Sequence, residues 1–228
     1  MGEIVEFASN GGTGQGYLAT PGDGGTGPGV LVIQEWWGLV DHIKKVCDRL
    51  AHEGFVALAP DLYHGKVTDE PDEAGKLMMT LNMEQAAKDM SGAIDELLRR
   101  SSTQTVGVIG FCMGGGLALL LATQRPDAVA ACVPFYGVIP PGGPSPDWAA
   151  MTASVQGHYA EIDDFAGPKA VAELTETLTG LSKDVDFHIY PTTQHAFFND
   201  TRPEVYNAEA AAAAWARAVT FLNTKLGF

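Results

Sequence analysis

The sequence predicts an α/β fold with a mostly parallel sheet and helices on both faces. Apolar strand-like runs alternate with amphipathic helix-like segments along most of the chain, which is typical of parallel sheets. The hydrophobic content of 46% supports a sizeable core. A length of 228 residues is long for a minimal domain and short for two full ones. We therefore expect residues 1–228 to form a single domain.

The elements of the first half follow from periodicity and turn residues. Residues 3–8 and 14–20 alternate around Asn10-Gly11-Gly12, which predicts a hairpin. Residues 30–33 are continuously apolar and predict a buried strand. Helical spacing at 41–53 predicts a helix with Asp41 as its N-cap, followed by a strand at 55–59. Residues 73–100 form the longest helical stretch, with a break expected near Asn82.

The second half continues the alternation of strands and helices. We expect strands at 105–109, 128–135, 153–157 and 187–190, and helices at 114–124, 169–178 and 203–226. The last helix opens with Pro203, a residue favoured at the first helical position.

Charge and targeting signals exclude several classes of function. The net charge of −14 repels phosphate backbones and anionic membrane surfaces, so nucleic acid and membranes are not expected partners. No apolar run approaches the roughly 20 residues of a spanning helix, and the first residues carry no basic or apolar signal region. Three cysteines without metal spacing favour a reducing cytoplasm. The sequence carries no signal for the oligomeric state.

One glycine-rich segment matches a nucleotide-binding pattern without its structural context. Gly22-Asp23-Gly24-Gly25-Thr26-Gly27 reads G-x-G-x-x-G. It precedes a predicted strand and opens no helix, so a phosphate would find no helix N-terminus there. We interpret it as a flexible loop.

The segment from Val106 to Gly116 indicates a catalytic nucleophile. A predicted strand runs into Gly110-Phe111-Cys112-Met113-Gly114, and a helix follows at once. This is the nucleophile-elbow pattern with Cys112 in place of serine. The sharp turn requires small residues at Gly110 and Gly114, and the helix N-terminus favours a thiolate. The alternative is a structural cysteine at a tight turn.

The chain order of such sites places an acid and then a histidine after the nucleophile. His195 follows a polar segment after a predicted strand, whereas His188 lies within that strand and suits a structural role. The acid is expected after the strand at 153–157, where Glu161, Asp163 and Asp164 are available.

Four motifs together resemble one known family. They are Gln34-Glu35-Trp36-Trp37-Gly38, Ala59-Pro60-Asp61-Leu62-Tyr63, Gly110-Phe111-Cys112-Met113-Gly114-Gly115 and His195-Ala196-Phe197. The chain is similar to the dienelactone hydrolase family of α/β-hydrolases from about residue 3 to residue 226. The resemblance implies the α/β-hydrolase fold and hydrolysis of small ester or lactone bonds, of the carboxymethylenebutenolidase type.

The resemblance also implies roles for individual residues. It carries a catalytic triad onto Cys112, Asp163 and His195, with Asp163 preferred over Asp164 because Phe165 follows it by two places. It further implies that Glu35 contacts the resting thiol and takes part in its activation when substrate arrives. The backbone N–H groups of Met113 and Trp36 are the expected oxyanion hole.

Three further residues are expected near the substrate, each with an alternative role. Trp37, like Trp36, would wall an apolar pocket or belong to the core. Tyr136 would line the same cleft or pack in the core, and Arg202 would point into the cleft or pack beside the last helix. The family holds anionic lactones with arginines, one shortly after the catalytic histidine, and here the first arginine after His195 is Arg202. We therefore expect an uncharged or otherwise different ester or lactone.

These residues predict a hydrolase that works through an acyl-thioester on Cys112. No metal or organic cofactor is expected, because the histidines show no ligand spacing. Two rival hypotheses are a peroxide-reactive thiol protein on a hydrolase scaffold and a binding module without catalysis.

Overall fold

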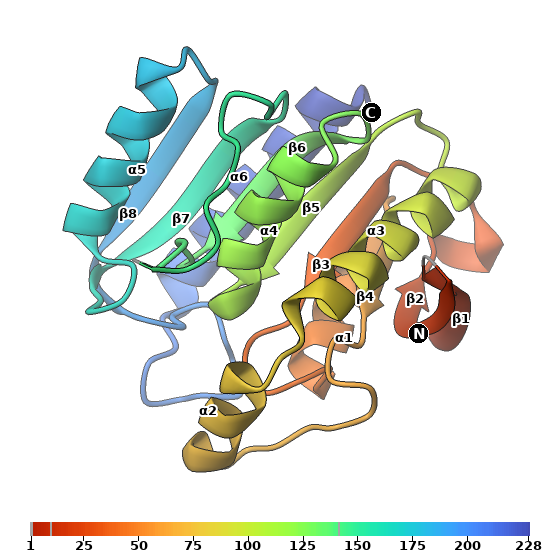
Figure 1. Ribbon diagram of the computed structural model, residues 1–228, viewed down its shortest axis with the longest axis horizontal. Helices are drawn as coiled ribbons and strands as arrows, with labels where there is room; N and C mark the ends of the chain where they lie inside the picture. Colours follow the sequence, from red (N-terminus) through yellow and green to blue (C-terminus); the bar gives the residue numbers. More distant parts are fainter. Residues whose placement is uncertain (1, 10, 141) are drawn as a thin grey trace. The chain divides into compact units, whose positions relative to one another are not determined.

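The computed structural model describes residues 2–9, 11–140 and 142–228 (Figure 1). The chain divides into two compact units, Met1–Val106 and Gly107–Phe228. Within the described residues, no helix combines the length and the apolar character needed to cross a membrane.

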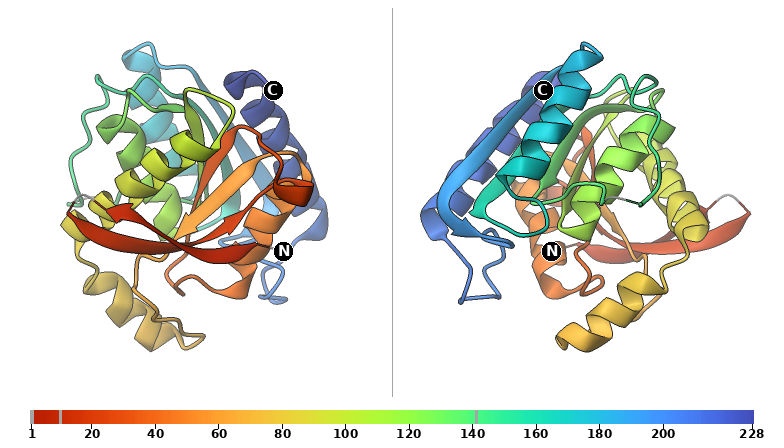
Figure 2. Two further views of the ribbon diagram at one scale, coloured as in Figure 1. Left: turned by 90° about the vertical axis from the view of Figure 1, so that its right-hand side faces the viewer. Right: turned by 60° about the vertical axis from the view of Figure 1, so that its left-hand side comes forward.

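The first unit contains four strands in the order β1-β2-β4-β3. Their bounds are Glu3–Ser9 for β1, Gly12–Ala19 for β2, Gly29–Ile33 for β3 and Val56–Pro60 for β4. The pairs β1–β2 and β2–β4 are antiparallel, and β3–β4 is parallel. The long twisted ribbon of β1 and β2 confirms the predicted hairpin (Figure 2), although its turn residue Asn10 lies outside the described residues.

Helices cover both faces of these strands. The bounds are Asp41–His52 for α1, Pro71–Met79 for α2 and Met83–Arg100 for α3. In Figure 1, α3 lies in front of the strands and α1 behind them. The expected break is confirmed, because the side-chain oxygen of Asn82 accepts a hydrogen bond from the Gln85 N–H at 3.1 Å and caps α3.

The N-cap predicted for the first helix was wrong by one residue. Asp41 is the first helical residue, and Val40 occupies the N-cap position. The carboxylate of Asp41 still lies in the first turn, where its negative charge interacts favourably with the positive end of the helix dipole. Gly54, with φ of 97°, follows the C-cap residue Glu53.

The glycine-rich segment at 22–27 belongs to the connection from β2 to β3. It contains one short 3₁₀ turn, Gly22–Gly24, closed by a hydrogen bond from the Gly25 N–H to the Pro21 carbonyl at 3.0 Å. The chain then enters β3, so the segment opens no α-helix.

The second unit has strands in the order β5-β6-β7-β8. Their bounds are Val106–Phe111, Val129–Phe135, Ser154–Ile162 and Val185–Gln194. The pairs β6–β7 and β7–β8 are parallel. Helices α4, Met113–Gln124, and α5, Pro168–Gly180, lie in front of these strands in Figure 1, and α6, Ala208–Leu226, lies behind them.

In this unit, the predicted ends of β7 and β8 and the predicted start of the last helix lie too early in the chain. β7 and β8 both run several residues further than expected and pair as far as Ile162 and Gln194. The added residues of β8, 191–194, are mostly exposed and lack the apolar signal of a buried strand. Those of β7 are buried up to Ala160, and only Glu161 and Ile162 are exposed. The last helix begins at Ala208 instead of Pro203, because Asn207 accepts a hydrogen bond from the Ala210 N–H at 3.0 Å and caps it there.

Candidate active site

Cys112 occupies the junction between β5 and α4 in a strained backbone conformation. Its φ of 54° and ψ of −118° lie in a region that residues other than glycine rarely adopt. Its backbone N–H donates to the Phe135 carbonyl at 3.0 Å, which ties the turn to β6. The side chain is partly exposed. The elbow therefore presents the thiol at the start of a helix, where the dipole favours negative charge.

Glycines leave the space that this turn needs. A Cβ atom at Gly110 would lie 2.1 Å from the Gly114 carbonyl oxygen. A Cβ atom at Gly137, after β6, would lie 2.5 Å from the Cys112 carbonyl oxygen. Sequence reasoning identified Gly110 and Gly114 but missed Gly137, whose signal was only its place at the end of a predicted strand.

Asp163 and His195 are brought together by the ends of β7 and β8. His195 Nδ1 lies 2.7 Å from Asp163 Oδ2, and the Asp163 side chain is completely buried. Asp163 Oδ1 accepts hydrogen bonds from the N–H groups of Phe165 at 2.8 Å and Ala166 at 3.0 Å. Burial, the largest single effect, raises the pKa of Asp163, but the hydrogen bond and charge of His195 and the two backbone hydrogen bonds together hold that pKa below its usual value.

The other two candidate acids lie elsewhere. Asp164 is exposed. Glu161 lies within β7, and its carboxylate accepts a hydrogen bond from the Thr192 N–H at 2.7 Å. Of the three carboxylates, Asp163 is the one hydrogen-bonded to His195.

His195 follows β8 directly and is one quarter exposed. Burial lowers its pKa, but hydrogen bonds to Asp163 and to Cys112 outweigh burial and raise that pKa to about 10. Because Nδ1 is engaged by Asp163, Nε2 is the nitrogen that faces Cys112. The imidazole thus connects the carboxylate with the thiol.

Two aromatic rings contact the imidazole of His195. Tyr136, which follows β6, is buried, and its ring centre lies 5.0 Å from that of His195 in an edge-on arrangement. Phe165 lies on the turn after β7, 5.8 Å from His195 and also edge-on, but it is 79% exposed. Sequence reasoning used Phe165 only to choose between Asp163 and Asp164 and did not foresee this ring contact, because an exposed loop aromatic has no periodic signal.

Glu35, Trp36 and Trp37 lie in the first unit, in the segment between β3 and α1. Glu35 is completely buried and Trp37 is largely buried. The ring centres of Trp36 and Trp37 lie 4.9 Å apart in an edge-on arrangement. The roles expected for Glu35 at the thiol, for the Trp36 N–H in the oxyanion hole and for Trp37 in the pocket stay predictions.

Arg202 forms an ion pair within its own loop. Its guanidinium Nε and Nη2 atoms lie 2.7 and 2.6 Å from Glu204 Oε1. The Glu204 carboxylate therefore already occupies the Nε–Nη2 edge of the guanidinium.

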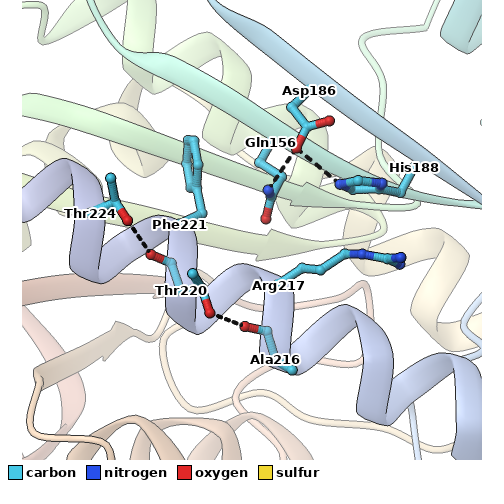
Figure 3. Close-up of a pocket in the computed structure, with 8 residues that line it drawn as sticks. All are labelled: Gln156, Asp186, His188, Ala216, Arg217, Thr220, Phe221 and Thr224. Atoms are coloured by element: carbon cyan, nitrogen blue, oxygen red, sulfur yellow. Dashed lines mark hydrogen bonds and ion pairs between the residues drawn. The ribbon is translucent and has the colours of Figure 1, made fainter.

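A separate open groove of about 480 Å³ lies between α6 and the strands β7 and β8 (Figure 3). Its lining residues are Gln156, Asp186, His188, Ala216, Arg217, Thr220, Phe221 and Thr224. Figure 3 shows Asp186 between Gln156 and His188, with hydrogen-bond distances of 2.9 and 3.0 Å. None of Cys112, Asp163 and His195 lines this groove.

A chain of polar contacts links Arg217 of α6, which lines the groove, to the buried Tyr190 and His158 of the sheet. Arg217 donates to the Tyr190 hydroxyl at 3.0 Å, and that hydroxyl lies 3.0 Å from His158 Nδ1. Burial holds the pKa of His158 well below its usual value, so this imidazole is neutral. Since Arg217 can only donate, the Tyr190 hydroxyl proton is left for His158 Nδ1.

Comparisons with known proteins agree on one family. Residues 15–226 match the sequence profile of the Dienelactone hydrolase family. The chain is 41% identical to "Protein usf" of Aquifex pyrophilus and 38% identical to a "Putative carboxymethylenebutenolidase" of Aquifex aeolicus, each over 99% of this chain and 100% of the relative.

A solved structure agrees with these relatives. A "Putative Dienelactone Hydrolase" from Klebsiella pneumoniae subsp. pneumoniae superposes with a TM-score of 0.85 at 27% identity, covering 97% of this chain and 98% of the other. The predicted α/β-hydrolase fold and the resemblance stated from the motifs are confirmed.

Proposed function

The chain belongs to the dienelactone hydrolase family and is an ester or lactone hydrolase, and on this basis we propose that Cys112, His195 and Asp163 are its catalytic triad. The observation that carries the proposal is the 2.7 Å contact of His195 with a buried Asp163, on an imidazole that also hydrogen-bonds Cys112. A nucleophile, a base and a group that orients the base are the parts that such catalysis needs.

In acylation, His195 takes the proton of the Cys112 thiol as general base, and the sulfur attacks the carbonyl carbon of the substrate. The imidazolium of His195 then gives its Nε2 proton to the leaving oxygen, and the alcohol departs while a thioester forms. Asp163 accepts the Nδ1–H of His195, which fixes the tautomer and stabilises the imidazolium.

Deacylation reverses the role of the histidine. His195 takes a proton from water, the resulting hydroxide attacks the thioester carbonyl, and the carboxylic acid leaves as the Cys112 thiol is restored. Met113 is the first residue of α4, so its backbone N–H is the oxyanion donor we assign within the second unit. We assign the second donor to the Trp36 N–H, and contact with the resting thiol to Glu35, by family resemblance.

The substrate we propose is a small ester or lactone without a carboxylate. Two observations support this choice. Arg202, the first arginine after His195, is paired with Glu204, and the net charge of −14 repels small anions. We further propose that residues 1–228 act as one α/β-hydrolase domain in the cytoplasm.

A pre-steady-state assay with p-nitrophenyl acetate under reducing, anaerobic conditions tests the triad. We expect a burst of about one equivalent of p-nitrophenol and an acetyl adduct on the intact mass of quenched protein. Cys112→Ala should show neither, and His195→Gln should slow both phases. Far-UV circular dichroism checks that each variant is folded.

The same assay separates the hydrolase from a thiol redox protein. Absence of both burst and adduct, with rapid consumption of one equivalent of peroxide by Cys112, would favour redox chemistry. The structure supports the hydrolase, because the other two thiols, Cys47 and Cys132, are completely buried and a resolving thiol must be accessible.

A further inference from the structure

Phe165 is an exposed aromatic side chain held against the imidazole of His195. Its ring is 79% exposed, and the two ring centres lie 5.8 Å apart in an edge-on arrangement. Ile162, three residues earlier at the end of β7, is 59% exposed. Two large apolar side chains near the end of this strand thus face solvent, and the ring of Phe165 contacts a histidine that also hydrogen-bonds Cys112.

A hydrogen bond within the turn fixes the backbone of Phe165. Its N–H donates to Asp163 Oδ1 at 2.8 Å, the oxygen that does not bind His195. The turn is compact, since a Cβ atom at Gly167 would lie 2.2 Å from the Asp163 carbonyl oxygen. The carboxylate that hydrogen-bonds His195 therefore also fixes the backbone of Phe165, and the ring contacts the imidazole.

The chemistry of the site says which part of a substrate meets this ring. In the proposed reaction, His195 protonates the leaving oxygen, so the alcohol portion must lie next to the imidazole. Tyr136, the buried ring neighbour of His195, is only 1% exposed and is closed to a ligand. Phe165 offers an open apolar surface next to the same imidazole.

We propose that Phe165 is a specificity-determining residue that contacts the alcohol portion of the substrate and favours esters and lactones with an apolar, planar leaving group. This inference rests on the proposed function of Cys112 and His195. A planar group gains from the Phe165 ring both apolar burial and an aromatic contact. The acyl portion, bonded to Cys112 after the first step, is not the part selected.

The test compares Phe165→Ala with wild type on substrates that differ at one end. 2-Naphthyl acetate and methyl acetate differ in the alcohol, and methyl acetate and methyl hexanoate differ in the acyl chain. We expect kcat/KM for 2-naphthyl acetate to fall about tenfold, mainly through KM. Methyl acetate and the acyl-chain preference should change less than about twofold.

Two further variants control this comparison. Phe228→Ala makes the same change at an aromatic that is 61% exposed at the end of the chain, and it should leave all three substrates unchanged. Phe165→Leu keeps an apolar surface and should restore part of the KM. An equal fall in kcat on all substrates would overturn the proposal, because Phe165 would then act by positioning Asp163 and His195. A changed acyl-chain preference would overturn it too.

A binding measurement separates this inference from the proposed function. 2-Naphthol, the alcohol product, is titrated against Cys112→Ala with and without Phe165→Ala, and its fluorescence is followed. Weaker binding in the double variant supports the contact even if wild type fails to form an acyl-enzyme. Equal binding in both proteins would overturn it whatever the outcome of the burst assay.

Discussion

The carboxylate of Asp163 divides its two oxygens between two structural tasks. Oδ2 lies 2.7 Å from Nδ1 of His195, and Oδ1 accepts the backbone N–H groups of the following turn. Binding to two backbone donors leaves the side chain little freedom to rotate away from the imidazole. The turn at the end of β7 is therefore part of what orients the histidine at the end of β8.

Asp163→Asn tests this assignment of the acid. The amide keeps the shape but favours the wrong imidazole tautomer, so we expect kcat for p-nitrophenyl acetate to fall by about 100- to 10,000-fold. Asp164→Asn, the adjacent exposed position, should stay within about twofold of wild type. Equal losses in the two variants, measured by steady-state kinetics, would assign the role to neither carboxylate in particular.

The protonation of His195 should depend on Cys112. In the folded protein its pKa is raised to about 10, partly by the hydrogen bond to Cys112. NMR titration of the imidazole should therefore give a midpoint near 10 in wild type. In Cys112→Ala the midpoint should fall but stay above the ordinary value, because Asp163 remains. An unchanged midpoint would mean that the thiol does not act on the imidazole.

The raised pKa of His195 also sets the sign of a stability change with pH. Because the folded pKa of about 10 exceeds the unfolded value near 6.5, this group stabilises the fold fully below pH 6.5. That contribution is lost as the pH rises towards 10. The free energy of unfolding of wild type relative to His195→Gln, from urea titration, should therefore shrink between pH 6.5 and pH 10. A constant difference would contradict the raised pKa.

Gly110→Ala should destabilise the elbow. The new Cβ would lie 2.1 Å from the Gly114 carbonyl oxygen, and backbone would have to move to relieve the overlap. We expect a loss of about 3 kcal/mol or more in the free energy of unfolding. Gly180→Ala, at the end of α5 with no atom within 4 Å, should change stability by less than about 1 kcal/mol. Similar values for the two, by chemical denaturation, would contradict the close approach.

Tyr190→Phe should lower stability without moving the triad. The change keeps the ring, whose centre lies 5.0 Å from that of Phe197, and removes the hydroxyl between Arg217 and His158. His158 is completely buried, so its unpaired nitrogen should cost about 1–3 kcal/mol. Tyr206→Phe, at a 39% exposed position, should change stability by less than about 0.5 kcal/mol. A Tyr190→Phe protein as stable as wild type would mean that the hydroxyl contributes nothing.

Local signals in the sequence were sufficient for most of the fold. The break near Asn82 was predictable from the sequence, and Asn82 caps α3 because its side chain bonds a backbone N–H three residues on. The continuous apolarity of β3 predicted a buried strand, and its residues are buried throughout. Both features depend on neighbours in the chain, which a single sequence contains.

Features that depend on distant partners were not predictable. The ends of β7 and β8 pair with each other as far as Ile162 and Gln194. No local sequence pattern predicts the register of this pairing. The same applies to the link from Arg217 through Tyr190 to His158, whose members are 27 and 32 residues apart. At the site, the elbow motif identified Cys112 directly, whereas the choice among three carboxylates required the resemblance.

At the left-handed backbone of Cys112, the residue that would make the fold most stable differs from the residue that supplies the proposed nucleophile. At a φ of 54° and ψ of −118°, any side chain costs about 1–3 kcal/mol that glycine avoids. Alanine would keep that strain, but glycine would relieve it and discard the thiol. Selection for stability alone would therefore replace this residue. If related proteins keep a cysteine at this position despite its cost in stability, then catalysis is still under selection in them.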